Sequence, residues 1–311
     1  MSILVTVPTD RLAENLGALP AGVELTVWDM GSPPPAERID IVVPPYMGGP
    51  QVLERLEGLD IRLVQGQSIG YDGVAEHLPS GMTFANAASV HETSTAELAL
   101  ALMLAAQRQI PRFVLAQQRG EWSPRFGPSL ADRRVLLVGF GGVGTAIARR
   151  LAPFEVEISA VARTARTERV DGVGDVTVHG THELPDLLAD ADIVVLSLPG
   201  GDETRHLFDA AMLSRLADGA LLVNVGRGGL IDTDALLAEL TTGRIRAALD
   251  VFEDEPLPAG HPLWQAPNLL ISPHMGGAST AMNPRIARLI RRQIERMLEG
   301  EPPVNVVLPA S

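Results

Sequence analysis

The chain has 311 residues, enough for about two domains, and its 46% hydrophobic and 20% charged residues are typical of a folded globular protein. Its 38 acidic residues outnumber the 25 basic ones, and the net charge of −13 disfavours nucleic acid and anionic membranes as partners without excluding a small anionic substrate. The absence of cysteine excludes disulfides and thiolate chemistry, and nothing in the sequence indicates a metal site.

The chain begins with a short apolar run, residues 2–8, that lacks a basic start and is too short for a secretory signal. No uninterrupted apolar stretch approaches the length of a membrane span. We therefore expect a cytoplasmic protein with no membrane partner.

The first part of the chain predicts a parallel sheet covered by helices, because short β-rich runs alternate with helical patterns. A helical pattern covers Gln51–Leu56. The predicted strands are Ile3–Val7, Glu24–Trp28, Asp40–Val43 and Ile61–Val64.

A long helix is predicted from His91 to about Phe113, because small and apolar side chains recur there at helical spacing. It is apolar on much of its circumference, which indicates burial. We expect its Thr95–Ala106 part to form the contact of a homodimer.

The second half of the chain predicts another doubly wound sheet, followed by an amphipathic helix at about Met282–Leu298. The arginines of that helix are expected on its solvated side. The predicted strands are Val135–Val138, Ile158–Val161, Asp192–Leu196, Ala220–Val223, Ala247–Leu249 and Leu269–Ile271.

A glycine-rich motif follows the first of these strands directly and precedes a helical run. Gly139 permits a tight turn, Gly141 lets the backbone approach a pyrophosphate, and Gly144 lets helix and strand pack closely. Gly142 and Val143 lie between them, where the helix N-terminus favours phosphate charge. This context favours a dinucleotide site over a purely structural turn.

The tip of the next strand indicates which dinucleotide binds. NAD-binding proteins of this kind usually have an acidic residue there, but this chain has Ala162 followed by Arg163, Thr164 and Arg166. Guanidinium groups bind a 2′-phosphate, so we predict NADP in preference to NAD, with NAD remaining possible. The alternative is that both arginines belong to an ordinary solvated loop.

Three further segments occur in order, and with them the sequence resembles the D-isomer-specific 2-hydroxyacid dehydrogenase family, in particular its glyoxylate/hydroxypyruvate reductase-like members. The resemblance covers essentially the whole chain. The three segments are Asn224–Asp232, Asp250–Pro256 and Ser272–His274, and the supporting ones are Gly66–Asp72, Thr95–Glu97, Gly120–Trp122 and His261–Trp264.

The resemblance implies that Arg227, Glu255 and His274 form the active site. Reduction of a 2-oxo acid builds negative charge on the carbonyl oxygen, which requires a proton donor and a fixed cation. His274 would donate the proton and Arg227 would hold the oxygen and the carboxylate. Glu255 would raise the pKa of His274 and fix its tautomer.

The family also suggests contacts outside this triad. Ile69 and Gly70 would offer backbone N–H groups to the substrate carboxylate. The alternative is that Ile69 is a core residue and Gly70 a turn glycine. Asp250 would accept a hydrogen bond from the nicotinamide amide, and Thr204 would lie near the cofactor.

The predicted fold is two doubly wound α/β domains. A flavodoxin-like substrate-binding domain would span residues 1–98, completed by 282–311, and a Rossmann dinucleotide-binding domain would span 99–281. The first functional hypothesis is a reductase for glyoxylate or hydroxypyruvate that uses NADPH.

Two alternatives stay open. Phosphite oxidation occurs on the same scaffold, but Ser68–Gly70 contains no additional basic side chain to support it. The second alternative is a dinucleotide-sensing protein that resembles the corepressors of this fold. An intact triad is compatible with an enzyme and also with such a sensor.

Overall fold

The computed structural model describes residues 2–310, which form two compact units. The first unit comprises the residues up to His91 and those from Gly277 onward, and the second comprises Glu92–Gly276. The two boundaries predicted from the sequence, at residues 98 and 282, lie a few residues later in the chain than the boundaries that the structure shows. Helix α3, Glu92–Gln107, explains the earlier first boundary, because all of it belongs to the second unit and its apolar side chains enter that unit's core.

The first unit is built on a six-stranded sheet with the order β14-β5-β4-β3-β1-β2. Its neighbouring strands are parallel except at the β14 edge, which is antiparallel to β5. Without that edge the order is the flavodoxin-like one that was predicted. The strands are β1 (Ile3–Val7), β2 (Val23–Val27), β3 (Arg38–Val42), β4 (Asp60–Gln65), β5 (Phe84–Ala85) and β14 (Val306–Leu308).

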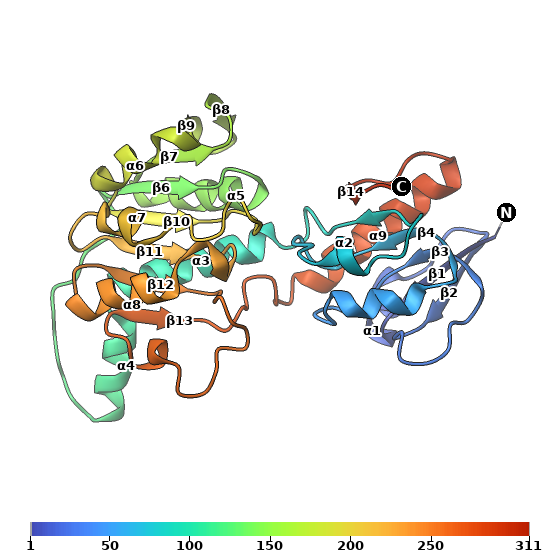
Figure 1. The fold of residues 1–311 in the computed structure, drawn as a ribbon, viewed down its shortest axis with the longest axis horizontal. Helices are drawn as coiled ribbons and strands as arrows, with labels where there is room; N and C mark the ends of the chain where they lie inside the picture. Colours follow the sequence, from blue (N-terminus) through green and yellow to red (C-terminus); the bar gives the residue numbers. More distant parts are fainter. Residues whose placement is uncertain (1, 311) are drawn as a thin grey trace. The chain divides into compact units, whose positions relative to one another are not determined.

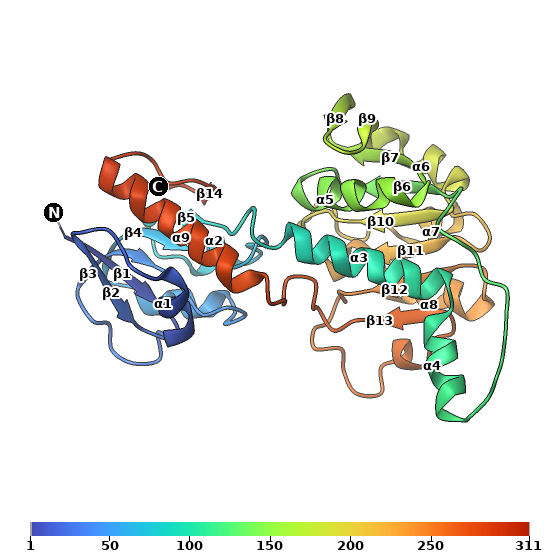
Figure 2. The same cartoon turned by 180° about the vertical axis from the view of Figure 1, so that it is seen from behind.

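Helices cover both faces of this sheet. One face packs against α1 (Asp10–Leu16) and α9 (Met282–Glu299), and Figure 2 shows α9 running across the strands. The other face packs against a 3-10 helix, Pro50–Leu56, with the short α2, Val74–His77, at its side. The amphipathic C-terminal helix predicted from the sequence is therefore confirmed, and it belongs to the first unit's core.

The second unit contains an eight-stranded sheet with the order β13-β12-β11-β10-β6-β7-β9-β8. All neighbours are parallel except β8, which forms an antiparallel hairpin with β9 that the sequence patterns did not predict. The order from β9 to β12 is that of a Rossmann domain, as expected. The strands are β6 (Arg134–Val138), β7 (Glu157–Ala162), β8 (Arg166–Val170), β9 (Gly174–Gly180), β10 (Ile193–Leu196), β11 (Leu221–Asn224), β12 (Arg246–Leu249) and β13 (Leu269–Ile271).

Alternating side chains divide the core of this unit between the two faces of its sheet. In β6, Leu136 and Val138 enter one cluster, while Val135 and Leu137 enter the other. As Figures 1 and 2 show, α3 and α5 cover one face, and α6, α7 and α8 cover the opposite one. These helices are α5 (Gly142–Leu151), α6 (Leu184–Leu187), α7 (Ala210–Ser214) and α8 (Thr233–Thr242).

The single long helix predicted over residues 91–113 is wrong. The structure has two helices, α3 (Glu92–Gln107) and α4 (Ile110–Gln118), bent by 65°. Pro111 causes the break, because it lacks an N–H for the carbonyl of Gln107 and its ring would clash with that carbonyl in a continuous helix. In the first turn of α4 the missing N–H costs nothing.

Among residues 2–310, no single helix is long and apolar enough to cross a membrane. Only the bent pair of α3 and α4 together reaches the necessary length and apolarity. Burial of α3 in the core of the second unit accounts for its apolar composition.

Helix α9 provides a matched test of the first unit's packing. Leu289 is 5% exposed in the core cluster, whereas Leu298 of the same helix is 40% exposed. We expect Leu289→Ala to lower the free energy of unfolding by about 2–5 kcal/mol because it leaves a cavity. Leu298→Ala should cost less than about 1 kcal/mol. Denaturant unfolding measures both, and equal losses would contradict this packing.

Candidate active site

The three residues of the predicted triad follow three neighbouring strands of the second sheet. Arg227 follows β11, Glu255 follows β12 and His274 follows β13, and these strands are parallel and adjacent. Because parallel strands end at a common edge, the structure brings the three loops together at the carboxyl edge of the sheet.

His274 and Glu255 form a direct pair. Nδ1 of His274 lies 2.5 Å from Oε2 of Glu255, and the other carboxylate oxygen accepts a hydrogen bond from the Phe252 N–H at 2.8 Å. Nε2 of His274 has no hydrogen-bond partner among residues 2–310, and the side chain is 43% exposed. The carboxylate thus holds Nδ1 and leaves Nε2 for a proton transfer.

The pKa values of the pair shift in opposite directions. The hydrogen bond to Glu255 raises the pKa of His274 against the opposing effect of burial, and the charges of Glu255 and Asp250 add to the rise. Burial alone would raise the pKa of Glu255, but the hydrogen bonds from His274 and Phe252 lower it overall. The pair therefore favours imidazolium beside carboxylate.

The loop that carries Arg227 is folded by a buried amide. Asn224 donates from Nδ2 to the carbonyl of Arg227 at 2.8 Å and accepts from the Gly226 N–H at 3.0 Å. The guanidinium of Arg227 donates to the Gly226 carbonyl at 2.8 Å. Its positive charge lowers the pKa values of both Glu255 and His274, so the three groups act on one another electrostatically.

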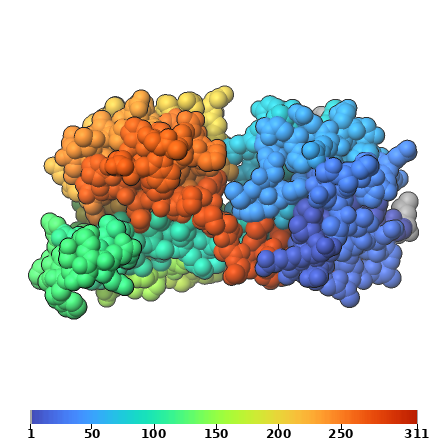
Figure 3. Space-filling model, turned by 90° about the horizontal axis from the view of Figure 1, so that it is seen from below, coloured from blue at the N-terminus to red at the C-terminus, as the bar shows by residue number. Residues whose placement is uncertain are grey.

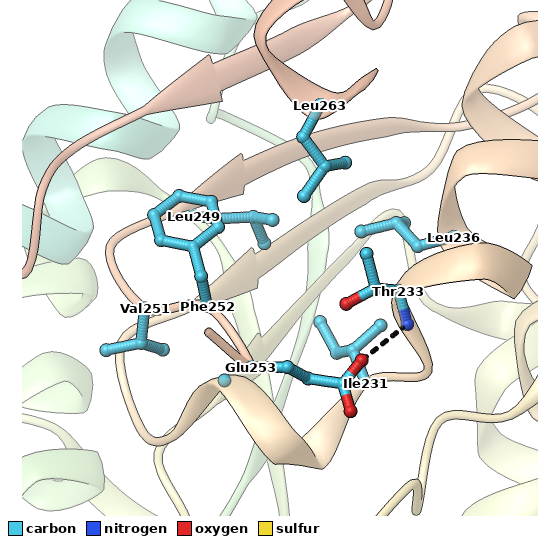
Figure 4. Close-up of a pocket in the computed structure, with 9 residues that line it drawn as sticks. Ile231, Thr233, Leu236, Leu249, Val251, Phe252, Glu253 and Leu263 are labelled. Carbon is cyan, nitrogen blue, oxygen red and sulfur yellow. Dashed lines mark hydrogen bonds between the residues drawn. The ribbon is translucent and has the colours of Figure 1, made fainter. Parts of the chain in front are cut away.

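Gly228 allows the loops after β11 and β12 to touch. A Cβ at this position would lie 1.8 Å from the carbonyl carbon of Phe252, so no side chain fits. The approach leaves a small pocket lined mostly by apolar side chains, with Thr233 and Glu253 as its polar members (Figure 4). Backbone contact at Gly228 sets the spacing between Arg227 and the loop of Glu255.

Glu253 anchors this second loop. Its carboxylate accepts from the Thr233 N–H at the start of α8 at 3.1 Å, drawn dashed in Figure 4, and lies 2.6 Å from Nε2 of His206. Burial would raise the pKa of Glu253, but these hydrogen bonds lower it overall. Sequence motifs do not indicate the roles of Glu253 and His206, because both contacts of Glu253 join segments distant in the chain.

Asp250 folds the loop of His274. Its buried carboxylate accepts from Ser272 Oγ at 2.6 Å and from the backbone N–H groups of Met275 and Gly276 at 2.7 and 2.8 Å. The Asp250 carbonyl also accepts from the His274 N–H at 2.7 Å. These bonds hold His274 at a φ of +55°, a conformation that costs about 1 kcal/mol or more. The hydrogen bond predicted between Asp250 and the nicotinamide amide stays a prediction.

The glycine-rich motif has the geometry expected of a dinucleotide loop. Gly139 follows β6 with a φ of +103°, and α5 begins at Gly142. A Cβ at Gly144 would lie 2.2 Å from the Gly139 carbonyl oxygen, whereas the Cβ side of Gly141 is open. β6 and β10 are neighbours where the strand order reverses, which is the usual dinucleotide position in such sheets.

The residues predicted to select the cofactor lie beyond β7. Arg163 and Thr164 are exposed directly after it, and Arg166 is the first residue of β8. Arg166 donates to the Phe140 carbonyl of the glycine-rich loop at 3.2 Å and pairs with Glu168 at 2.6 Å. Glu168 was not predicted as a partner of Arg166, because the β8–β9 hairpin that carries both was not predicted either.

The remaining predicted residues lie in two other loops. Ile69 and Gly70 are half-buried after β4 in the first unit, and Ile69 accepts from Asn86 Nδ2 at 2.8 Å. Thr204 lies in the loop after β10, where its hydroxyl donates to the Pro199 carbonyl at 3.0 Å. Their contacts with substrate and cofactor stay predictions.

A family model matches this site. The D-isomer specific 2-hydroxyacid dehydrogenase, NAD binding domain, matches residues 100–276. The chain therefore belongs to that family, as its motifs predicted, and it is an NAD(P)-dependent oxidoreductase. Together with the two α/β units, this confirms both the predicted family and the predicted fold class.

Proteins whose names state an activity are similar to this chain over most of its length. Glyoxylate reductase from Thermofilum pendens is 34% identical over 259 residues, which are 80% of this chain and 75% of that protein. A D-isomer specific 2-hydroxyacid dehydrogenase from Xanthobacter autotrophicus Py2, solved with NADPH and MES, has a TM-score of 0.81 and 31% identity, with 98% of each chain covered. NADPH-dependent glyoxylate/hydroxypyruvate reductase from Sinorhizobium meliloti, solved with NADP and sulfate, has a TM-score of 0.82 and 25% identity, covering 99% of this chain and 98% of that one.

The His274–Glu255 pair leads to a test by titration. Glu255→Gln removes the negative charge that stabilises the imidazolium, so the pKa of His274 should fall toward the ordinary value of about 6.5. His274 would then lose its proton at a lower pH than in the unmodified protein. Imidazole chemical shifts followed by NMR against pH measure the change.

A matched control is Glu54→Gln, which removes the carboxylate that lies 2.7 Å from His77 in the first unit. This change should leave the titration of His274 where it was. An unchanged His274 titration in Glu255→Gln would show that the pair does not set its protonation.

Proposed function

We propose that the protein reduces a small 2-oxo acid, glyoxylate or hydroxypyruvate, with NADPH. The observation that carries the proposal is the His274–Glu255 pair. Nε2 of His274 has no hydrogen-bond partner among residues 2–310, and the charge of Arg227 acts on the pKa of His274. The activities of the similar proteins from Thermofilum pendens and Sinorhizobium meliloti support the same substrates.

The loop after β6 fits a dinucleotide. The open side of Gly141 admits a phosphate, and the first N–H groups of α5, at Gly142 and Val143, have no partner within the helix. The bound reduced nicotinamide supplies the hydride.

The chain's own residues complete the reaction. As the hydride reaches the carbonyl carbon, the carbonyl π electrons move to oxygen, and His274 donates its Nε2 proton there. Arg227 holds this oxygen and the substrate carboxylate, which stabilises the developing charge. Glu255 keeps the ring protonated until transfer.

Initial rates with glyoxylate, hydroxypyruvate and pyruvate, each with NADPH and NADH, test the proposal. We expect turnover that favours NADPH, and a loss of about 100-fold or more in kcat for His274→Ala because the proton donor is gone. Failure with every acid contradicts the proposal. Turnover of phosphite would then indicate phosphite oxidation, and tight dinucleotide binding without turnover would indicate a sensor.

The preference for NADPH rests on Arg163 and Arg166. Arg166 lies beside the glycine-rich loop, and a 2′-phosphate would compete with Glu168 for its guanidinium. Replacing both arginines by Ala should raise the KM for NADPH about tenfold or more and change the KM for NADH about twofold at most.

Arg169→Ala is the matched control, because Arg169 lies on the same hairpin and pairs with Asp175 at the exposed surface. Its KM values should stay near those of the unmodified enzyme. An equal rise in both KM values for the double variant would mean that the arginines do not read the 2′-phosphate.

We also propose a homodimer whose contact includes the predicted Thr95–Ala106 part of α3. One side of this helix, with Ala99, Leu102 and Met103, is buried within the second unit, whereas Ala101 on another side is exposed. Exposed apolar side chains also gather on α4 and the following loop, where Trp122 is 96% and Phe126 is 102% exposed. Figure 3 shows this bright green segment on the surface of the second unit. Because a two-fold interface pairs one patch with itself, a second copy is its proposed occupant.

Sedimentation equilibrium tests the dimer. Trp122→Glu combined with Phe126→Glu should convert a dimeric mass into a monomeric one, because it places charges in an apolar contact. Leu298→Glu, an equally drastic change at an exposed leucine of the first unit, should leave the dimer intact. A monomeric unmodified chain would refute the proposal.

A further inference from the structure

A buried histidine of the first unit lies outside the triad and is not used in the mechanism above. His91 is 4% exposed, and its ring stacks on Tyr46 with centroids 5.7 Å apart. Nε2 lies 2.6 Å from the Gln67 carbonyl oxygen, and Nδ1 lies 3.1 Å from the Gly277 carbonyl oxygen. A carbonyl oxygen only accepts, so each contact is a hydrogen bond when the ring nitrogen carries a proton.

These contacts connect segments that are distant in the sequence. His91 is the last residue of the first unit before the chain passes into the second, and Gly277 is the first residue after its return. A Cβ at Gly277 would lie 2.8 Å from Nδ1 of His91. The imidazole therefore occupies a closely fitted place between the return segment and the loop after β4.

His91 is one of three donors that hold successive carbonyl groups of that loop. The Gln67 carbonyl contacts Nε2 of His91 at 2.6 Å. The Ser68 carbonyl accepts from the Ala87 N–H at 2.9 Å, and the Ile69 carbonyl accepts from Asn86 Nδ2 at 2.8 Å. All three donors come from residues 86–91, so one short segment holds three consecutive peptide groups.

Holding the carbonyl groups also orients the N–H groups. In a trans peptide the C=O and the following N–H point in opposite directions. The N–H groups of Ser68, Ile69 and Gly70 are consequently turned away from residues 86–91, and none of them has an acceptor among residues 2–310. Consecutive free backbone N–H groups form a concavity that suits an anion.

We propose that His91 is a positioning residue for the acid substrate, which it serves by holding the Gln67 carbonyl so that the N–H groups of residues 68–70 face the substrate carboxylate. The proposal rests on the proposed function, because the anion is the carboxylate of the 2-oxo acid. His91 does not touch the reacting atoms, so its loss weakens substrate binding rather than the chemical step.

Three substitutions at position 91 separate its two contacts. His91→Leu removes both. His91→Gln places an amide nitrogen near Nε2 and restores donation to Gln67, whereas His91→Asn places it near Nδ1 and restores donation to Gly277. We expect His91→Leu to raise the KM for glyoxylate roughly fivefold or more, with kcat within about threefold and the KM for NADPH unchanged. His91→Gln should recover most of the lost affinity and His91→Asn little of it.

Trp28→Phe is the control for a loss of stability alone. Trp28 is similarly buried in the first unit and donates from Nε1 to the Ser32 carbonyl at 2.9 Å, beyond the edge strand β2, which does not neighbour β4. This change should lower the melting temperature without changing the KM for glyoxylate.

The outcomes are distinguishable. If the unmodified enzyme reduces no 2-oxo acid, the proposed function fails. If it does, and folded His91→Leu keeps the original KM for glyoxylate, this inference alone fails. Equal KM values for His91→Gln and His91→Asn would also overturn it, because the Gln67 contact would then have no special part.

Discussion

The site depends on one geometric constraint, the parallel pairing of β11, β12 and β13. Their register places three loops at one edge of the sheet, and each loop carries one member of the triad. Gly228 then sets the distance between the first two loops, because its backbone contacts that of Phe252 with no room for a side chain. Reactive groups from three separate segments are thereby held in one place by rigid backbone.

Buried or half-buried polar side chains give each loop its shape. Asn224 folds the loop of Arg227, Glu253 ties the loop of Glu255 to the start of α8, and Asp250 holds the loop of His274. A buried carboxylate or amide without a partner would be costly, and these groups each have two or more partners. The hydrogen bonds therefore select one loop conformation, including the left-handed backbone of His274.

The two units use backbone groups in a similar way. In the second unit, the glycine-rich turn leaves the first N–H groups of α5 without helical partners. In the first unit, the segment 86–91 holds the carbonyl groups after β4 and leaves the opposing N–H groups without acceptors among residues 2–310. Backbone donors suit anionic ligands in a chain of net charge −13, because they attract an anion without requiring a basic side chain.

Much of the fold could be predicted from the sequence, because apolar periodicity is a local property. It located ten strands to within a few residues, counting the four before residue 65 and the six from β6 to β13 other than the β8–β9 hairpin. The short β5 and β14 were missed because two or three residues carry no period, and α3 was predicted too long because the effect of Pro111 was overlooked.

The sequence by itself determined the family, the order of the motifs and the residue types that the chemistry requires at Arg227, Glu255 and His274. Only the tertiary structure decided which distant groups each site segment contacts: Asp250 bonds the His274 loop, Glu253 accepts from the first N–H of α8, Glu168 pairs with Arg166, and His91 contacts the Gln67 carbonyl. The physical reason is that a motif is contiguous in the chain, whereas the partner of a buried polar group is chosen by packing between segments that the sequence leaves far apart.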